Sequence, residues 1–237
     1  GINFSDHNFA WHDMMLRIAD PEAADWLAGG FGRDWQGEPN AARAEFAGGM
    51  ELHSLDGKAH AAALEPVLDL IVNARETIEL ASAYPTFPFV DAMAAAARRG
   101  VRVCIYTPRP NNKPIVRDYL LGTARKSEMR IMLTEEMSHV KAMLVDGEVL
   151  VAGSCNFDFV AHRCNAEYVA TIRDPSAIAD FEARLLAPLR AGAREARADE
   201  CPAWRSRAAS LKLGFADAVI ARLPHRAGAV EWAKLRE

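Results

Sequence analysis

The chain has 237 residues, of which 50% are hydrophobic and 25% charged. This composition is typical of a globular protein with one large or two small cores, and it excludes a disordered chain. The net charge of −4 gives no sign of a polyanion-binding surface, although a local basic groove can exist within a balanced total. The four cysteines have no C-x-x-C spacing, and no apolar run is long enough for a bilayer-spanning helix.

The first third of the chain predicts a strand, a helix and a linker. Met14 to Ala19 reads as a strand that ends at Asp20-Pro21, where Asp is a favourable N-cap and Pro suits the first helical position. A helix is expected from there to about Trp35. The stretch Gly37 to Gly49 is rich in Gly, Ala and Pro and is the best candidate for a linker.

A repeating pattern of helices and strands follows the linker. Helices are expected over residues 64–75, 88–99 and 113–126, and strands over residues 77–83, 101–106 and 129–133. Strands that alternate with helices of this size predict an α/β fold with a mostly parallel or mixed sheet covered on both faces.

The next segment predicts a β-hairpin that carries chemically active side chains. In Ser138 to Val145, His139 and Lys141 share one face of the strand because side chains alternate. Asp146-Gly147 is a two-residue hairpin signal, and Glu148 to Ala152 forms the returning strand. The hairpin would bring Gly153-Ser154 and Asn156 close to His139 and Lys141.

The spacing of these residues is specific. His139, Lys141 and Asp146 form H-x-K-x4-D, and Gly153-Ser154 follows after six residues with Asn156 close behind. In every fixed position the segment resembles the signature of the phospholipase D superfamily. The resemblance implies an α-β-α sandwich with a mixed sheet and phosphodiester chemistry through a phosphohistidine, without a metal or other cofactor.

The resemblance also implies roles for individual residues. The catalytic set would be His139, Lys141, Asp146 and Glu167, with Glu167 fixing the tautomer of His139 and Asp146 anchoring the turn. The phosphate-binding set would be Lys141, Ser154, Asn156 and Asn3. Glu167 precedes a further expected strand, Tyr168 to Arg173, and a helix from Pro175 to about Arg190.

The beginning of the chain echoes this second part. Gly1-Ile2-Asn3-Phe4 resembles Gly153-Ser154-Cys155-Asn156-Phe157, and both are followed by an acidic residue and an Asp-Pro pair. Asp13 follows Asn3 by 10 residues, and Glu167 follows Asn156 by 11. Asn3 and Asp13 are therefore interpreted as first-half counterparts of Asn156 and Glu167; a chance match over a short stretch is the alternative.

Enzymes of the resembled superfamily commonly carry two motifs, one in each half, around a shared site. We therefore expect residues 1–46 to be the C-terminal remnant of a first half with its linker, residues 47–191 a complete second half, and residues 192–237 a helical tail. The two copies should superpose through a pseudo-two-fold rotation. In the tail, residues 211–223 and 229–235 look amphipathic and would either pack on the domain or contact a membrane surface or partner.

Three functions remain open from the sequence. The first is a phospholipid phosphodiesterase or phosphatidyltransferase, similar to phospholipase D or cardiolipin synthase, that needs the missing first half and contacts the membrane peripherally. The second is a nuclease in which a homodimer supplies two copies of His139, although the charge balance disfavours nucleic acid. The third is a non-catalytic fragment or binding domain. A metal site is not expected because His7, His12, His53 and His60 lack ligand spacing; a cytoplasmic or peripheral membrane location is expected.

Overall fold

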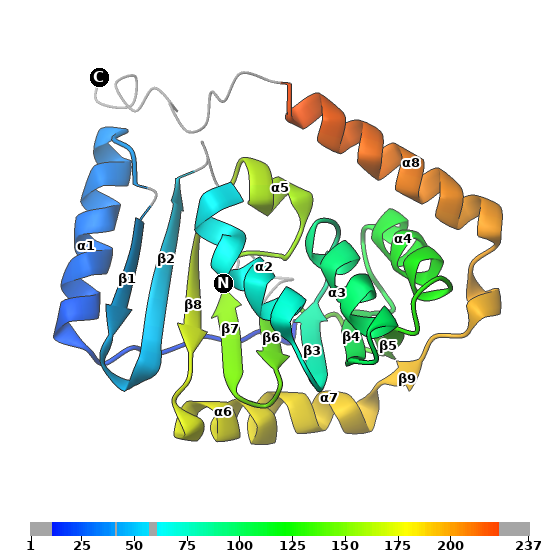
Figure 1. The fold of residues 1–237 in the computed structure, drawn as a ribbon, viewed down its shortest axis with the longest axis horizontal. Helices are drawn as coiled ribbons and strands as arrows, with labels where there is room; N and C mark the ends of the chain where they lie inside the picture. The colour runs from blue at the N-terminus through cyan, green and yellow to red at the C-terminus, as the bar shows by residue number, and fades with distance from the viewer. Residues whose placement is uncertain (1–10, 41, 57–60, 223–237) are drawn as a thin grey trace.

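The computed structural model describes residues 11–40, 42–56 and 61–222 (Figure 1). Strands of these residues form one nine-stranded sheet in the order β1-β2-β8-β7-β6-β3-β4-β5-β9. The neighbours β3, β4 and β5 are parallel, and the other neighbouring pairs are antiparallel. The sheet is therefore mixed, as the sequence predicts.

The elements follow one another as an alternation of strands and helices. The strands are β1 (Ala42–Phe46), β2 (Met50–Asp56), β3 (Thr77–Ser82), β4 (Arg102–Pro108), β5 (Arg130–Thr134), β6 (Lys141–Val145), β7 (Val149–Gly153), β8 (Ala166–Ile172) and β9 (Arg194–Glu195). The α-helices are α1 (Pro21–Gln36), α2 (Ala61–Asn73), α3 (Phe89–Arg98), α4 (Pro114–Ala124), α5 (Phe159–Arg163), α6 (Pro175–Phe181), α7 (Ala187–Gly192) and α8 (Ala203–Ile220). Short 3₁₀ turns are η2 (Ala47–Gly49) and η4 (Ala198–Glu200), and the π-helical segment η3 (Glu182–Leu186) joins α6 to α7.

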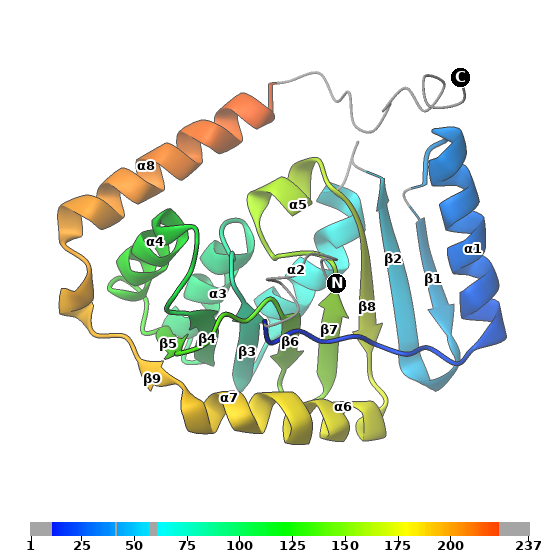
Figure 2. The same ribbon diagram turned by 180° about the vertical axis from the view of Figure 1, so that it is seen from behind.

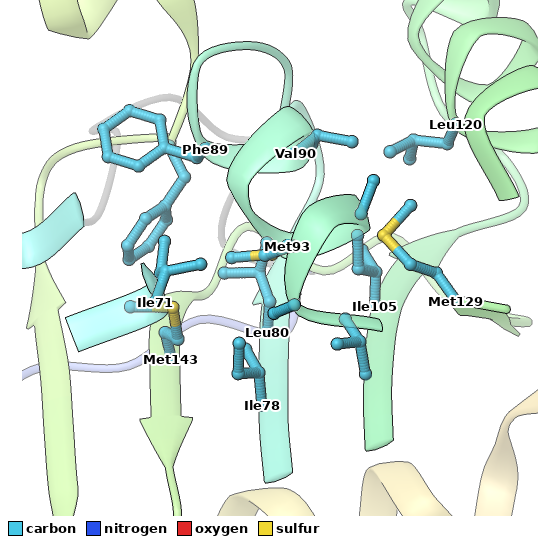
Figure 3. Packing of buried hydrophobic residues seen from close by; sticks show 14 of the residues in the cluster. Ile71, Ile78, Leu80, Phe89, Val90, Met93, Ile105, Leu120, Met129 and Met143 are labelled. Atoms are coloured by element: carbon cyan, nitrogen blue, oxygen red, sulfur yellow. The ribbon is translucent and has the colours of Figure 1, made fainter. Parts of the chain in front are cut away.

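Each face of the sheet has its own hydrophobic core. On one face, Ile71 of α2 and Met93 of α3 pack with strand residues that include Ile78, Leu80 and Met143 (Figure 3). On the other face, side chains of α6, η3 and α7 pack on the central strands together with α1 (Figure 2). Because both faces are covered, β6 is buried along its whole length and reads as a nearly continuous apolar run.

The hairpin between β6 and β7 turns at the expected residues, with one residue more in its loop. Val145 pairs with Val149, so the loop contains Asp146, Gly147 and Glu148 rather than two residues. Asp146 and Gly147 both have positive φ angles, of 53° and 69°. Asp146 tolerates this conformation because its carboxylate accepts hydrogen bonds from the backbone N–H groups of residues 75–77.

Gly153 marks a close approach between β7 and β8. A Cβ atom built on Gly153 would lie 2.2 Å from the carbonyl oxygen of Tyr168 and 2.9 Å from the Cα atom of Val169. Both obstructing atoms belong to the backbone and cannot rotate away. The glycine of the Gly-Ser pair is therefore a packing requirement that brings Ser154 against the neighbouring strand.

The main differences from the predicted elements lie in the first third of the chain. Met14 to Ala19 is extended but forms no strand, whereas its presumed counterpart in β8 is hydrogen-bonded on both sides, by β2 and β7. An extended segment needs a neighbouring strand to pair its backbone groups, and this one has none in the described sheet. The expected linker Gly37 to Gly49 contains the edge strand β1, and β2 was not predicted.

The C-terminal helix also differs from the prediction. It is α8, which begins at Ala203 instead of Leu211 and ends at Ile220. The second expected helix, over residues 229–235, lies outside the described residues, as does Asn3. None of the described helices is both long enough and apolar enough to cross a membrane.

Candidate active site

Two segments distant in the sequence meet just before β6. The backbone N–H of His12 donates to the carbonyl of Met137 at 3.0 Å, and the N–H of His139 donates to the carbonyl of His12 at 2.7 Å. These contacts form a parallel bridge between His12 and Ser138. As a result, Trp11 and Asp13 lie beside the motif histidine.

His139 lies between a carboxylate and an ammonium group. Its Nδ1 atom is 3.2 Å from Oδ2 of Asp13, and its Nε2 atom is 2.9 Å from Nζ of Lys141. The same ammonium group is 3.1 Å from Nδ1 and donates to the carbonyl of His139 at 2.9 Å. His139 and Lys141 are only 8% and 5% exposed.

These contacts are best satisfied by one tautomer of His139. A carboxylate can only accept a hydrogen bond, so Nδ1 carries the proton that Asp13 receives. An ammonium group can only donate, so Nε2 is the unprotonated nitrogen and accepts from Lys141. In this tautomer the single lone pair of Nε2 faces Lys141, and Nε2 can act as a nucleophile or a general base only when the ammonium group turns to a substrate oxygen instead.

Burial and charge act on both partners of His139. Burial alone would raise the pKa of Asp13, but hydrogen bonds from His139 and from the Met14 N–H hold it below its ordinary value. Burial lowers the pKa of Lys141 to about 8, although Asp13 and Glu167 act in the opposite direction. At neutral pH the side chain of Asp13 is therefore a carboxylate, and Lys141 is mostly in its ammonium form.

The buried ammonium group of Lys141 predicts a measurable cost in stability. The difference between a pKa of about 8 and the ordinary 10.5 corresponds to about 3 kcal/mol. By this amount the charged Lys141 destabilises the folded state relative to the unfolded chain. Lys141→Met is expected to raise the free energy of unfolding at pH 7 by roughly 2 kcal/mol, a smaller gain because His139 loses a donor. Urea unfolding of both chains measures the difference.

The sign of this effect fixes its pH dependence. Since the folded pKa lies below the unfolded one, the penalty is fully present below pH 8 and is relieved as the pH rises from about 8 to 10.5. The advantage of Lys141→Met should therefore shrink at pH 10. A variant less stable than the parent chain at pH 7 would show that the lysine is stabilising.

Strand β3 connects the second part of the motif with Lys141. Ser82 pairs with Lys141 in the sheet, and its hydroxyl donates to the backbone carbonyl of Asn156 at 2.9 Å. The side-chain oxygen Oδ1 of Asn156 is buried and has no hydrogen-bond partner in the described part of the chain. An amide oxygen can only accept a hydrogen bond, so a phosphate oxygen would have to be held by the side-chain NH2 of Asn156, and its phosphate-binding role stays a prediction.

Ser154 has a different position from the one predicted. Its hydroxyl oxygen accepts from the backbone N–H of Tyr168 at 3.1 Å and lies 3.5 Å from the carbonyl of the same residue. The hydroxyl therefore ties the end of β7 to β8. No contact of Ser154 with His139 or Lys141 is found among the described residues, so its phosphate-binding role stays a prediction.

The partner of His139 was predicted wrongly. Glu167 was expected to bind His139, but the carboxylate at hydrogen-bond distance is that of Asp13. Glu167 lies at the start of β8, is 9% exposed, and accepts from the side-chain amide of Asn165 at 3.1 Å. The negative charge of Glu167 nevertheless acts to raise the pKa of Lys141.

Asp146 lies away from His139 and Lys141. It lies beyond Val145, at the opposite end of β6 from Lys141. Partial burial would raise its pKa, but the three backbone hydrogen bonds lower it below the ordinary value. The motif aspartate thus anchors the turn, as the sequence predicts, and a catalytic role for it stays a prediction.

Two aromatic side chains that were not predicted from the sequence lie beside His139, and a lysine lies beside one of them. The ring of Trp11 is 5.6 Å from the imidazole and that of Tyr84 is 6.4 Å away, measured between centroids. Tyr84 donates to Asn112 at 2.7 Å, and Nζ of Lys113 lies 4.3 Å from the centroid of the Tyr84 ring. Tyr84 follows β3, and Asn112 and Lys113 follow β4, so their positions at the carboxyl ends of parallel strands could have identified them.

The described residues contain no group of three or more His, Cys, Asp or Glu side chains that could hold a metal ion. Of the histidines considered for such a site, His53 is buried in β2 near the hydroxyl of Thr171, whereas His12 lies in the segment beside His139. His7 and His60 lie outside the described residues.

Comparisons with known proteins agree with this fold and motif. Residues 67–187, about half of the chain, match the protein family described as "Cardiolipin synthase, PLD-like domain". The chain belongs to this family and thereby to the phospholipase D superfamily, which confirms the resemblance and the predicted fold class.

Individual relatives match the chain over different lengths. Cardiolipin synthase A of Serratia proteamaculans is 30% identical over 116 residues, which are 46% of this chain and 24% of that protein. Cardiolipin synthase A of Escherichia coli is 27% identical over 198 residues, 73% of this chain and 40% of that protein. The chain thus spans less than half the length of these curated relatives.

Two solved structures have the same fold. The phospholipase D family member Nuc from Salmonella typhimurium has a TM-score of 0.55 at 20% identity and covers 66% of this chain and 99% of its own. Phosphatidylserine synthase from Haemophilus influenzae has a TM-score of 0.56 at 16% identity and covers 77% of this chain and 49% of its own. At these identities the likeness concerns the fold alone.

Proposed function

We propose that this chain provides the second catalytic half of a phospholipid phosphodiesterase or phosphatidyltransferase similar to cardiolipin synthase. The observation that carries the proposal is the placement of His139 between Asp13 and Lys141. A phosphodiester is anionic, so an imidazole next to a fixed ammonium group suits attack by an unprotonated ring nitrogen or, once that nitrogen carries a proton, protonation of the leaving group. Family membership and the cardiolipin synthase relatives support a phospholipid as the substrate.

The chemistry we propose needs two histidines. One motif histidine forms a bond from nitrogen to phosphorus while the phosphorus–oxygen bond to the leaving alcohol breaks, and the other gives that alcohol its proton. The second histidine then takes a proton from water or from an acceptor alcohol, which displaces the phosphohistidine. In this scheme His139 is the acid and base of the second half, and Lys141 and Asn156 hold phosphate oxygens.

The acidic residues support a site shared by two halves. Asp13 corresponds to Glu167 in the internal repeat, and yet Asp13 contacts the histidine that precedes Glu167 in the sequence. If the two halves exchange carboxylates symmetrically, Glu167 would hold the motif histidine of the first half. In the described part of the chain, the carboxylate of Glu167 has Asn165 as its only hydrogen-bond partner, so it can accept further hydrogen bonds.

The proposal is tested by supplying a first half. The purified chain alone should release no choline from phosphatidylcholine and no glycerol from phosphatidylglycerol above background, because a single motif histidine cannot serve both roles. Co-expression with a first phospholipase D-like half should produce turnover that persists in EDTA. Release of headgroup and transfer to glycerol are measured separately, which distinguishes hydrolysis from phosphatidyl transfer.

Molecular mass in solution completes the test. Robust turnover from a verified monomer of these 237 residues would contradict the two-half proposal. Turnover from a dimer, with nucleic acid as the better substrate, would favour the alternative in which two copies each supply His139. No turnover in any combination would favour a non-catalytic binding domain.

A further inference from the structure

Helix α8 packs on the domain through a narrow inner face. Ser206, Ala209 and Leu213 are buried and recur at intervals of three and four residues, so they share one side of the helix. A Cβ atom on Gly122 of α4 would lie 2.6 Å from Cβ of Ser206, so the two helices are in close contact. Arg163 of α5 forms an ion pair with Asp217, which fixes the far end of α8 (Figure 1).

The opposite side of α8 carries large apolar side chains in solvent. Leu211 is 75% exposed and Phe215 is 73% exposed, and Trp204 and Val219 are exposed as well. The spacings of 7, 4 and 4 residues align all four on one stripe, which we call the α8 stripe, about 22 Å long at 1.5 Å per residue. A surface helix normally has one apolar face, so a second one indicates a contact made with another phase or molecule.

A basic groove borders the stripe. It lies between α8 and the helices α3 and α4, has a volume of about 1110 Å³, and is lined by Leu211 of the stripe and by Arg98, Lys126 and Arg207. These three cations have no carboxylate partner within the described ranges. The two acidic residues of the groove have other partners: Asp91 accepts a hydrogen bond from Tyr119, and Asp217 forms an ion pair with Arg163.

We propose that the α8 stripe and its basic groove dock the protein on a bilayer that contains anionic phospholipid. This inference rests on the proposed function, which makes the substrate a lipid. Apolar side chains that include Trp and Phe, beside unpaired Arg and Lys, match the interface between acyl chains and charged headgroups. Nucleic acid would use the cations but would leave the stripe in water.

Docking through α8 would also orient the active site. The helix is joined by Arg163 to α5, and α5 begins directly after Asp158, two residues beyond Asn156. The lipid surface would therefore contact an element adjacent to the loop that carries Asn156. Reversible binding to the membrane agrees with a substrate that is itself part of the bilayer.

The test is flotation of the full chain with lipid vesicles, which measures binding and does not depend on catalytic turnover. The chain should float with vesicles of phosphatidylcholine and phosphatidylglycerol, and much less with phosphatidylcholine alone. Leu211→Gln/Phe215→Gln should reduce the bound fraction on anionic vesicles by about tenfold or more, since both side chains lose their apolar contact. Lys126→Gln/Arg207→Gln should weaken vesicle binding by about fivefold for each charge removed. This loss should occur only with anionic vesicles at low salt.

The matched control is Phe31→Gln, which removes a 65% exposed aromatic residue of α1 and should leave binding unchanged. Equal binding by the Leu211/Phe215 variant and the parent chain would overturn the proposal. So would DNA binding that requires only the cations, a dimer that the stripe variant dissociates, or vesicle binding that appears only after residues 223–237 are removed. Vesicle binding without lipid turnover would leave the docking surface intact and contradict only the proposed function.

Discussion

Replacing His139 with alanine in the complete two-half protein is expected to reduce phosphodiesterase turnover by a factor on the order of a thousand or more. His139 is the only motif histidine of this chain, and its Nε2 atom faces the ammonium group that would hold the phosphate. The residues of a catalytic unit depend on one another, so a positive charge introduced at another position should not compensate for the loss of His139. Initial rates with a chromogenic phosphodiester and with phosphatidylglycerol vesicles measure the loss.

His53 provides the control histidine. It is buried in β2, three strands from β6, and lies near the hydroxyl of Thr171. His53→Ala should lower the thermal stability because it leaves a cavity, but turnover for each folded molecule should stay close to the parent value. Similar losses in the two variants, after correction for the folded fraction, would mean that His139 acts through folding alone.

The hairpin shows why part of the site can be predicted from sequence. Alternation places His139 and Lys141 on one face of the strand, and Asp146-Gly147 reverses the chain because both residues adopt positive φ. These are local rules, and the structure follows them to within one loop residue. Close approach of β7 and β8 likewise requires glycine at position 153, which the motif already contains.

Contacts between distant segments could not be predicted in the same way. The interpreted repeat makes Asp13 the counterpart of Glu167, but the spacing does not predict which of the two carboxylates lies at His139. That choice depends on how residues 11–13 pair with residues 137–139, a non-local backbone contact. Met14 to Ala19 shows the same limit, because a strand pattern forms a strand only where a neighbouring edge is available.

The carboxylates also permit the sharpest test of the proposed exchange between halves. Asp13→Asn should reduce turnover of the two-half protein by roughly a hundredfold to ten-thousandfold, because the amide can favour the wrong tautomer of His139. Glu167→Gln should cause a comparable loss through the motif histidine of the first half. Activity alone therefore does not distinguish the two variants.

The ring nitrogens of His139 do distinguish them. In this chain without a first half, Asp13→Asn should change the ¹⁵N chemical shifts of Nδ1 and Nε2, because the acceptor that holds the Nδ1 proton is replaced. Glu167→Gln should leave both shifts unchanged, since its hydrogen bond comes from Asn165. The opposite pattern would assign Glu167 to His139 and contradict the exchange. The proposed two-half site therefore depends on one observed contact, that of Asp13 with His139, and on the interpretation of Asp13 as part of a first half.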